Sequence, residues 1–553
     1  MANGPTFISL PNELLEDIFR RAQTPSSSLF ALANTCARLQ FSCLSLYLQD
    51  FGQIDPEESC TVIMEGEPRD DDVLAALSLS TFITKTKHFS CRFQGSSLHI
   101  LLHNFSRVER LLHRFSSVGA VTLDFNAQDK TYMDITDRDI LAWTDSIGQL
   151  LNTILERDCT SLEVNGLTQM THVYQDALRM FRPQSSPSLL STLKSYFSPS
   201  DQERQTQTPP PNPPPYVLSG PTWKYERNRF GSTTKTQTPI LAHLSPAAQI
   251  KSHLTHFTIG SKSLLCPPLL QWTCSVLASS PISTLTIRDV NFFGATWSIL
   301  TILLPQSIPT LKRLELSNIG SFSHDQITRL MDSFPDLEYL SAERLELPWY
   351  TGLTSHTMQS IAFPTFRHLV ELRVPEHWIL PCFEFTPESL PVLKVLTIVF
   401  YDGEGWRRLE DQHSPVRKLF VDLSGRGQGL GVTVNMDILA NTDIIRWMQM
   451  QRYQRSRLEE DEAERWIHCV SGLYLMFKGR VQFAHVLNAK PIVEAWFGQF
   501  PGLKRVSLRS QDKEAATVKS MEEFCRYTMP SVVKRLDCLE VNGKELTMEV
   551  SEE

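Results

Sequence analysis

The sequence contains no long uninterrupted hydrophobic run. Its longest apolar stretches, near 299–304 and 473–477, are far shorter than the roughly 20 residues that a membrane-spanning helix needs. A secretory signal is not expected either, because Glu13, Glu16 and Asp17 interrupt the place of its apolar core. We therefore expect a protein with no membrane partner, located in the cytoplasm, the nucleus or both.

Basic residues are not in excess. The chain of 553 residues has 53 Lys and Arg against 61 Asp and Glu, a formal net charge of −8. Neutralising nucleic-acid phosphates requires the opposite balance, so we expect no nucleic-acid partner. The 11 cysteines are scattered and form no C-x-x-C pair, which indicates reduced thiols rather than a disulfide framework.

Catalytic and cofactor motifs are missing as well. The chain has no G-x-S-x-G, no G-x-x-x-x-G-K-[ST] and no H-E-x-x-H sequence. The glycines of 425–431 have the wrong spacing for a dinucleotide loop and favour a flexible connection. His99 and His103 lie four residues apart in an expected helix, but no third ligand is suitably spaced. These absences favour a protein that is not an enzyme and has no cofactor or metal.

Two amphipathic helices are predicted within the first fifty residues. The first helix carries apolar residues at helical spacing, namely Leu14, Leu15, Ile18 and Phe19. A second apolar face follows Pro25 and consists of Leu29, Leu32, Ala33, Cys36 and Leu39. A segment this short buries too little surface to fold alone, so its faces require another surface. That surface belongs either to a partner protein or to the rest of this chain, on which the helices would be an ordinary cap.

The order Leu10-Pro11, Glu13-Leu14-Leu15, Ile18-Phe19 and Cys36-Ala37-Arg38-Leu39 resembles the F-box. Proteins of that family dock on the Skp adaptor subunit of cullin–RING ubiquitin ligases, and the resemblance covers roughly residues 8 to 50. Many F-boxes carry a bulky aromatic residue, often Trp, after the Cys-Arg, where this chain has Phe41. The resemblance implies binding to a Skp subunit, and through it to a cullin, by Leu10, Pro11, Leu14, Leu15, Ile18, Phe19, Leu32 and Cys36.

A second pattern repeats through the body of the chain. Residues 311–316 and 393–398 read L-x-x-L-x-L. Looser copies begin at Leu254, Ile282, Leu337, Leu369, Val416, Leu503 and Leu536. From 254 to 416 the copies lie 23 to 32 residues apart, and a proline precedes most of them. This period resembles an irregular leucine-rich repeat, which stacks into a solenoid, and a conventional α/β domain is the alternative.

The predicted fold class is therefore an α/β repeat, with an N-terminal helical F-box followed by an irregular leucine-rich-repeat solenoid. Such a solenoid has a curved, mostly parallel sheet with helices on its convex side, and the whole resembles fungal-type F-box proteins. The expected parts are an F-box-like helical domain at 1–52, irregular repeats at 53–182, a Pro/Ser/Thr-rich disordered loop at 183–250, a leucine-rich-repeat array at 251–431, a charged helical insertion at 432–500 and C-terminal repeats at 501–553.

The predicted loop at 183–250 holds twelve of the 33 prolines, too many for a packed layer. It also contains Ser/Thr-Pro pairs that are candidates for proline-directed phosphorylation, at Ser186, Ser198, Thr208, Thr238 and Ser245. Any loop of this composition contains such pairs, so phosphorylation here is a hypothesis for intact-mass measurement.

Strand alternation fixes which side chains of a solenoid face a ligand. The leucines point into the core, so the residues between them line the concave sheet. These candidates for substrate binding are Arg313, Glu315, Tyr339, Glu371, Arg373, Lys418, Phe420 and Arg505. Mixed charge with aromatic anchors suits protein recognition, although each residue alone also fits a solvated sheet position.

The sequence thus predicts a substrate-recognition adaptor of an SCF-type (Skp–cullin–F-box) ubiquitin ligase, with an unknown protein substrate. The alternative is a repeat scaffold for protein interactions whose degenerate F-box no longer enters a ligase. A hydrolase on an α/β scaffold would require a clustered nucleophile and base, which the sequence does not display.

Overall fold

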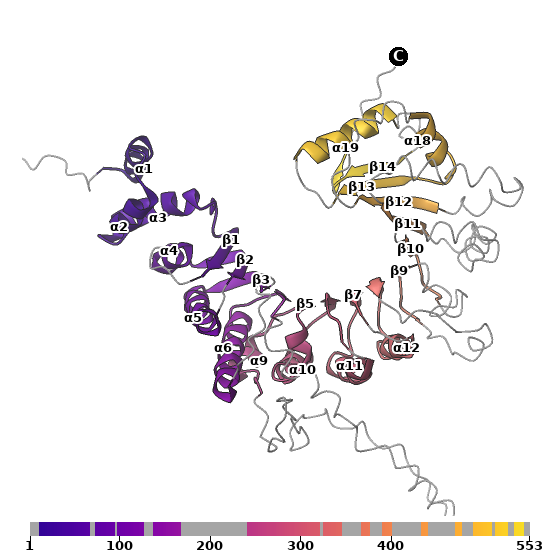
Figure 1. The fold of residues 1–553 in the computed structure, drawn as a ribbon, viewed down its shortest axis with the longest axis horizontal. Helices are drawn as coiled ribbons and strands as arrows, with labels where there is room; N and C mark the ends of the chain where they lie inside the picture. The colour runs from indigo at the N-terminus through magenta and orange to yellow at the C-terminus, as the bar shows by residue number, and fades with distance from the viewer. Residues whose placement is uncertain are drawn as a thin grey trace, which may run out of the picture. The chain divides into compact units, whose positions relative to one another are not determined.

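The computed structural model describes residues 10–66, 72–94, 97–125, 136–167, 241–292, 294–320, 324–345, 366–375, 390–400, 433–440, 470–477, 490–510, 515–528 and 536–546. The chain divides into two compact units, Met1–Pro309 and Thr310–Glu553. Both units are built from alternating strands and helices (Figure 1). Among the described residues, no helix combines the length and the apolar character needed to cross a bilayer.

Three helices open the first unit, α1 (Asn12–Arg21), α2 (Ser26–Ala33) and α3 (Ala37–Asp50). Pro11 and Pro25 are the N-cap residues of α1 and α2, where their missing N–H groups are not needed. Both helices contact α3. The side chains buried among them include Leu15, Phe19, Leu29, Ala33 and Leu39.

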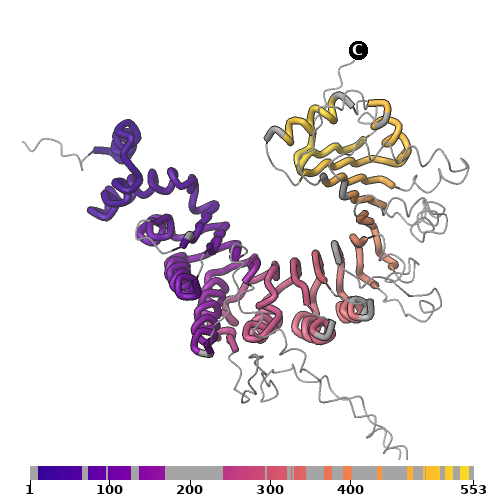
Figure 2. Tube along the Cα trace, in the orientation of Figure 1, coloured from indigo at the N-terminus to yellow at the C-terminus, as the bar shows by residue number. Residues whose placement is uncertain are grey.

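The rest of the first unit repeats strand and helix. Its strands are β1 (Ser59–Glu65), β2 (Lys85–Gln94), β3 (Ser117–Asp124), β4 (Ser161–Asn165), β5 (His256–Gly260) and β6 (Thr284–Arg288). They pair in parallel in chain order. The helices are α4 (Val73–Leu79), α5 (Leu98–Arg114), α6 (Asp137–Leu155), α9 (Pro246–Lys251), the 3-10 helix η3 (Lys262–Leu265), α10 (Leu270–Ser279) and α11 (Gly294–Ser307). Helices α4, α5, α6 and α10 lie on one side of the strands (Figure 1), and the chain passes repeatedly between the two rows (Figure 2).

The second unit continues the same alternation. Its strands are β7 (Arg313–Ile319), β8 (Tyr339–Leu345), β9 (Glu371–Pro375), β10 (Val395–Phe400), β11 (Thr433–Ala440), β12 (Val470–Phe477), β13 (Arg505–Ser510), β14 (Cys538–Val541) and β15 (Lys544–Glu545). Strands β7 to β14 pair in parallel in chain order, and β15 is antiparallel to β14. The described helices are α12 (His324–Asp332), α18 (Lys490–Phe497) and α19 (Ala515–Thr528).

The L-x-x-L-x-L pattern explains these strands. Leu311, Leu314 and Leu316 are at most 1 % exposed, and the residues between them face the opposite side of the sheet. Helices start at side-chain caps where the sequence offers them. The Thr136 hydroxyl and the Asp139 carboxylate form a reciprocal capping box at the start of α6. The prediction of a mostly parallel, repeat-like α/β fold is confirmed at this level.

The prediction of a charged helical insertion at 432–500 is wrong for two segments of that range. Residues 433–440 and 470–477 form the parallel strands β11 and β12. Val434, Met436 and Ile438 are buried apolar residues two positions apart, which is the period of a strand and not of a helix. The charged residues at 455–465 suggested a helix for the whole region, but they lie outside the described residues.

The predicted disordered loop at 183–250 is wrong at its C-terminal end. Ala242 is buried and Ser245 caps α9 by accepting a hydrogen bond from the Ala248 backbone N–H at 3.0 Å. The Ser245 hydroxyl donates to Glu156 Oε1 at 2.8 Å. Ser245 is therefore part of the folded unit, whereas residues 183–240 and the repeat expected at Val416 lie outside the described residues.

Candidate functional site

The residues predicted to contact a Skp subunit differ strongly in exposure. Leu15 is fully buried and Phe19 is 6 % exposed. Leu14 and Ile18 are 50 % and 40 % exposed. Pro11 is exposed, and the remaining members of the set are half-buried, namely Leu10, Leu32 and Cys36. The structure therefore leaves some of these side chains available and encloses others.

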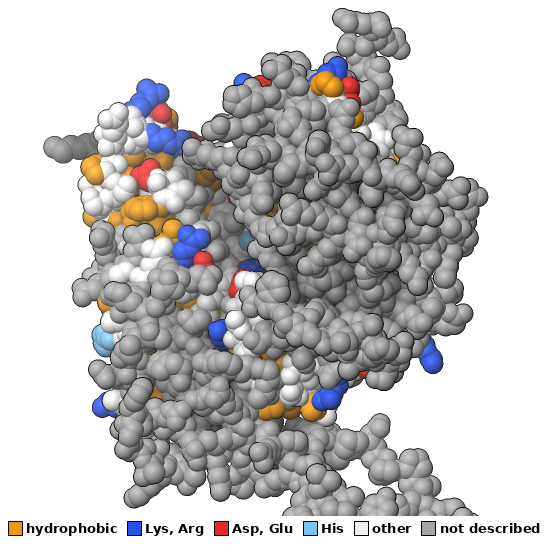
Figure 3. Space-filling view, turned by 45° about the vertical axis from the view of Figure 1, so that its right-hand side comes forward, with side chains coloured by type: hydrophobic (Ala, Val, Ile, Leu, Met, Phe, Trp, Pro, Cys, Tyr) orange, Lys and Arg blue, Asp and Glu red, His pale blue; other side chains and the backbone are white. Residues whose placement is uncertain are grey.

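Leu15 and Phe19 hold the helices together instead of facing a partner. We correct the prediction for these two residues, because side chains enclosed among α1, α2 and α3 cannot reach another protein. Leu14 and Ile18 lie four residues apart on α1 and so share a face. Hydrophobic side chains reach the surface on the side of the N-terminal helices (Figure 3). The available apolar surface of α1 is thus centred on Leu14 and Ile18.

Phe41, which stands where many F-boxes have Trp, contacts another part of this chain. Its ring meets that of Phe82 edge to face, with ring centres 4.8 Å apart, and 42 % of the residue stays exposed. Next to it, Gln40 Nε2 donates to the Leu79 carbonyl oxygen at 2.9 Å. Helix α3 is therefore fixed to the segment that follows α4. The sequence signal for this contact is the apolar pair Phe82-Ile83, which lies between α4 and β2.

The strand face of the second unit begins with three predicted residues that bind one another. The Arg313 guanidinium carbon lies 3.5 Å from the centre of the Tyr339 ring, and Arg313 Nε lies 2.8 Å from Glu315 Oε1. All three side chains are half-buried. The charges of Arg313 and Glu315 neutralise each other. These residues therefore present the stacked Tyr339 ring rather than an unpaired charge.

Arg373 lies between two carboxylates from different strands. Its Nε is 2.6 Å from Glu343 Oε1, and its terminal nitrogen forms an ion pair with Asp437. Asp437 is only 4 % exposed. Burial raises the pKa of the Asp437 carboxyl, and the Arg373 guanidinium opposes that shift. Buried charges are retained only when they are paired, so these three groups form one interdependent cluster.

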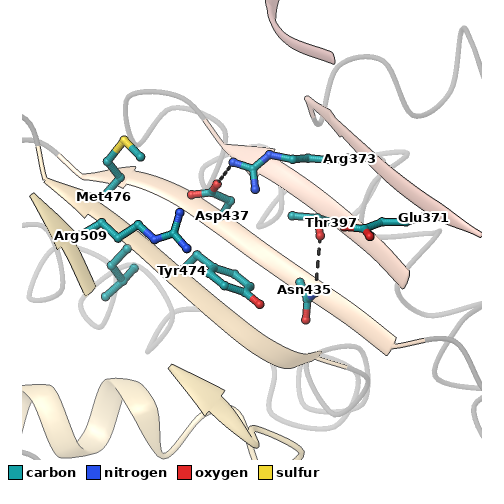
Figure 4. Close-up of a pocket in the computed structure, with 9 residues that line it drawn as sticks. Glu371, Arg373, Thr397, Asn435, Asp437, Tyr474, Met476 and Arg509 are labelled. Carbon is teal, nitrogen blue, oxygen red and sulfur yellow. Dashed lines mark hydrogen bonds and ion pairs between the residues drawn. The ribbon is translucent and has the colours of Figure 1, made fainter. Parts of the chain in front are cut away.

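A polar cavity of about 120 Å³ opens on this face. Its lining comes from strands β9 to β13 and consists of Glu371, Arg373, Thr397, Asn435, Asp437, Tyr474, Leu475, Met476 and Arg509 (Figure 4). Glu371 and Arg373 were predicted from the repeat, but the residues of β11 and β12 were missed. The alternation of apolar and polar residues in 433–438 is the signal that could have found Asn435 and Asp437.

A glycine on the neighbouring strand makes room for the amide of Asn435. Asn435 pairs in register with Gly472, and a Cβ atom built on Gly472 would lie 2.1 Å from Asn435 Oδ1. The Asn435 side chain therefore lies over the backbone of β12. On its other side Asn435 Nδ2 donates to Thr397 Oγ1 at 3.4 Å, a long hydrogen bond.

Arg505, a further predicted residue of this face, does not line the cavity. It pairs in register with Gly472 and Cys538. Hydrogen bonding to the side chains of Tyr474 and Cys538 raises the pKa of Arg505, an exposed residue. The remaining predicted residues of this face, Lys418 and Phe420, lie outside the described residues.

The chemistry of the cavity is that of hydrogen bonds and ion pairs. Its lining includes no cysteine, histidine or serine. Elsewhere in the described parts of the chain, no group of three or more His, Cys, Asp or Glu could hold a metal ion. His99 and His103 are exposed on α5. Burial raises the pKa of Cys60 to about 12, so that thiol stays protonated.

A scan against models of protein families finds no match for this sequence, and a search of curated proteins finds none either.

Proposed function

We propose that this chain is a non-catalytic substrate-recognition adaptor of an SCF-type ubiquitin ligase in the cytoplasm or nucleus. In this proposal α1, α2 and α3 bind a Skp subunit, and through it a cullin. The polar face of the strands binds a target protein. Ubiquitin transfer occurs on other subunits, and the adaptor raises the effective concentration of the target near them.

The exposed pair Leu14 and Ile18 is the observation that carries the proposal. These apolar side chains are about half exposed on a helix whose opposite face is already enclosed. Burying a leucine or isoleucine completely contributes roughly 1.5–3 kcal/mol. A partner that covers both side chains therefore gains binding energy without disturbing the packing of Leu15 and Phe19.

The attachment of α3 to the first repeat gives further support. The Gln40 hydrogen bond to Leu79 and the Phe41–Phe82 ring contact join the helices to the segment before β2. An adaptor has to hold its ligase end and its target end together, because a flexible connection lowers the effective concentration. Contacts of this kind restrict motion at the start of the repeats.

The test is the double variant Leu14→Ser with Ile18→Ser. We expect it to lose co-purification with a Skp subunit while its circular dichroism and melting temperature match those of the wild type. The matched control is Leu141→Ser on α6, where the leucine is similarly exposed at 46 %. Wild-type recovery of the Skp subunit by the folded double variant would overturn the proposal.

One observation favours the second candidate function, a scaffold outside a ligase. Phe41 contacts Phe82 of the same chain, so part of the surface of its ring is covered by this chain and is not available to a partner. Affinity capture in the presence of a proteasome inhibitor separates the two functions. A ligase adaptor brings a cullin together with the Skp subunit, whereas a scaffold brings the Skp subunit alone or neither protein.

A further inference from the structure

The first strand of the sheet has a free edge that the chain itself covers in part. Strand β1 pairs with β2 on one side, and among the described residues no strand lies on its other side. An edge strand presents backbone N–H and carbonyl groups to which a strand of another molecule can bind, and this leads to association or aggregation. What covers the free edge of β1 therefore decides whether the chain associates there.

The side chain of Gln53 occupies this edge. Gln53 Nε2 donates to the Thr61 carbonyl oxygen at 2.8 Å, and the Thr61 N–H donates to Gln53 Oε1 at 2.9 Å. The Ser59 N–H, the preceding edge group, donates to the Asp55 carbonyl oxygen at 2.9 Å. A side-chain amide has the same donor and acceptor as a peptide group, so Gln53 binds Thr61 as one residue of an added strand would.

The C-terminal end of α3 places Gln53 at the edge. The Gly52 N–H donates to the Gln49 carbonyl oxygen at 2.9 Å, and the Gln53 N–H donates to the Leu48 carbonyl oxygen at 2.8 Å. These two bonds form a Schellman motif, which requires a left-handed residue, and Gly52 has a φ of +76°. The turn leads from α3 to β1 (Figure 1), and the Gln53 side chain is only 7 % exposed. The amide is therefore held in place by the end of the helix.

The amide covers only part of the edge. Successive residues of a strand direct their backbone groups to opposite sides, so Ile63 directs its N–H and carbonyl to the same free side as Thr61. The Gly66 N–H, on the opposite side, donates to the Gln94 carbonyl oxygen of β2 at 2.9 Å, as this alternation requires. The Ile63 side chain is 48 % exposed. An added strand could thus start at Ile63 but would meet Gln53 at the next edge position.

The last strands in the sheet order are closed by a different device. Strand β15 folds back antiparallel on β14 through Asn542 and Gly543, which both have positive φ. It consists only of Lys544 and Glu545, and both residues are exposed. A short, charged edge strand offers little to another strand. The β14 edge is thus closed by a turn of the backbone, whereas the β1 edge depends on one side chain.

We propose that Gln53 is an edge block that prevents β1 from pairing with β1 of a second copy of this chain. With the amide in place, the open edge is limited to the surroundings of Ile63. Without it, Thr61 and Ile63 form a continuous edge, and two such edges can pair antiparallel about a two-fold axis, with the same residues used in both copies. This inference goes beyond the proposed function and does not rest on it.

The first test is the variant Gln53→Leu, which keeps the size of the side chain and removes its donor and acceptor. We expect sedimentation equilibrium of the full-length variant to give a self-association constant at least about tenfold above that of the wild type. The reason is that the backbone hydrogen bonds of Thr61 become available in both copies. The product should be a dimer, because the other end of the sheet order remains closed by β15.

The matched control is Gln40→Leu on α3. Gln40 also uses its Nε2 group to bind a backbone carbonyl, that of Leu79 at 2.9 Å, but it lies on a helix and covers no strand edge. This variant loses a hydrogen bond of the same kind. We expect it to associate no more than the wild type does.

A second substitution locates the contact between the copies. Ile63→Lys, added to Gln53→Leu, places like charges at the shared edge and should return association to the wild-type level. In the wild-type background Ile63→Lys should have no effect on association. If the double variant associates as strongly as Gln53→Leu does, another surface joins the copies and the proposal is wrong.

Hydrogen exchange of the wild-type chain tests the edge without any substitution. The Thr61 amide should be protected by Gln53, whereas the Ile63 amide should exchange close to the rate of an unstructured peptide. Residue-resolved exchange with fragmentation mass spectrometry measures both. Fast exchange of Thr61, or equal protection of the two amides, would overturn the proposal. This measurement decides the matter if circular dichroism shows that Gln53→Leu is unfolded.

A folded Gln53→Leu variant that associates no more than the wild type would also overturn the proposal, as would open-ended polymers in place of a dimer. The result is independent of the Skp experiment, because association is measured on the purified chain. The variant Leu14→Ser with Ile18→Ser keeps Gln53 and Thr61 and should associate like the wild type. Loss of Skp binding and loss of the edge block are therefore distinguishable.

Discussion

In each unit asparagine, glycine and arginine pair across three neighbouring strands, yet among the described residues only the row of the first unit contains an ion pair. In the first unit Arg288 reaches Asn165 and Glu163. In the second unit Arg505 is exposed and forms no ion pair within the described part of the chain, and a cavity is lined by Asn435. The same residue types on three paired strands can therefore give a closed contact or an open pocket.

The length of the middle strand also differs between the two rows. Strand β5 ends at Gly260, and the chain turns into the 3-10 helix η3 at Lys262. Strand β12 instead continues beyond Gly472 to Phe477, and Tyr474 on this extension pairs in register with Ser507.

The largest contrast between the regions is expected in thiol reactivity. Cys159 precedes β4 and is fully buried, and burial raises its pKa to about 12, whereas Cys538 beside Arg505 is half-buried. Alkylation by iodoacetamide requires an accessible thiolate, so at pH 8 the half-buried Cys538 should react at least about tenfold faster than the enclosed Cys159. Raising the pH from 7 to 9 keeps Cys159 below its pKa and protonated. Peptide mass spectrometry checks this, and equal labelling of the folded chain would contradict the burial of Cys159.

The next contrast concerns the arginines that are paired with carboxylates. Arg373→Ala leaves Asp437 buried without its partner and should lower the free energy of unfolding by about 3–5 kcal/mol. Arg288→Ala breaks an ion pair whose side chains are 38 % and 30 % exposed, and the expected loss is at most about 1 kcal/mol. Urea denaturation followed by circular dichroism compares the two variants. Similar losses would show that the cluster in the second unit is no more interdependent than the contact in the first.

A smaller contrast is expected between the two glycines. Gly260→Ala displaces Asn165, which hydrogen bonds to Arg288 and Glu163, and should cost about 1–3 kcal/mol. Gly472→Ala displaces an amide whose hydrogen bond to Thr397 is 3.4 Å long, and we expect a loss below about 1 kcal/mol. Thermal unfolding of both variants measures which substitution lowers stability more. A larger loss for Gly472→Ala would contradict the prediction.

The finest contrast is a pair of double-mutant cycles. Asn165→Ala and Arg288→Ala should be coupled by roughly 0.5–1.5 kcal/mol, since their side chains are hydrogen bonded. Asn435→Ala and Arg505→Ala should be additive within about 0.5 kcal/mol, because no hydrogen bond or ion pair joins these two described side chains. Strong coupling in the second cycle would mean that Arg505 reaches into the cavity in solution.

Much of the strand array follows from local sequence. The leucines at 311, 314 and 316 predict a strand with one buried face, and the strand is found at Arg313–Ile319. The same pattern in 503–508 predicts β13. Local hydrophobic periodicity is sufficient here, because a single buried face determines the conformation of each short strand.

The cavity could not be predicted to the same extent. Glu371 and Tyr474 are separated by about a hundred residues, and only the parallel pairing of five strands places them around one cavity. Strands β11 and β12 were not predicted, because the charged residues between them favour a helix. Their own alternation, with Val434, Met436 and Ile438 buried, was present in the sequence.

The sequence by itself determined the repeating strands, the helix caps and the apolar side chains of α1, since these depend on neighbours within a few residues. Only the tertiary structure decided that Leu15 is enclosed while Leu14 is exposed. It also decided that Arg288 reaches Asn165 while Arg505 does not line the cavity. The physical reason is that a side chain binds the best acceptor within reach, and the acceptors within reach are set by the register and length of strands that are distant in sequence.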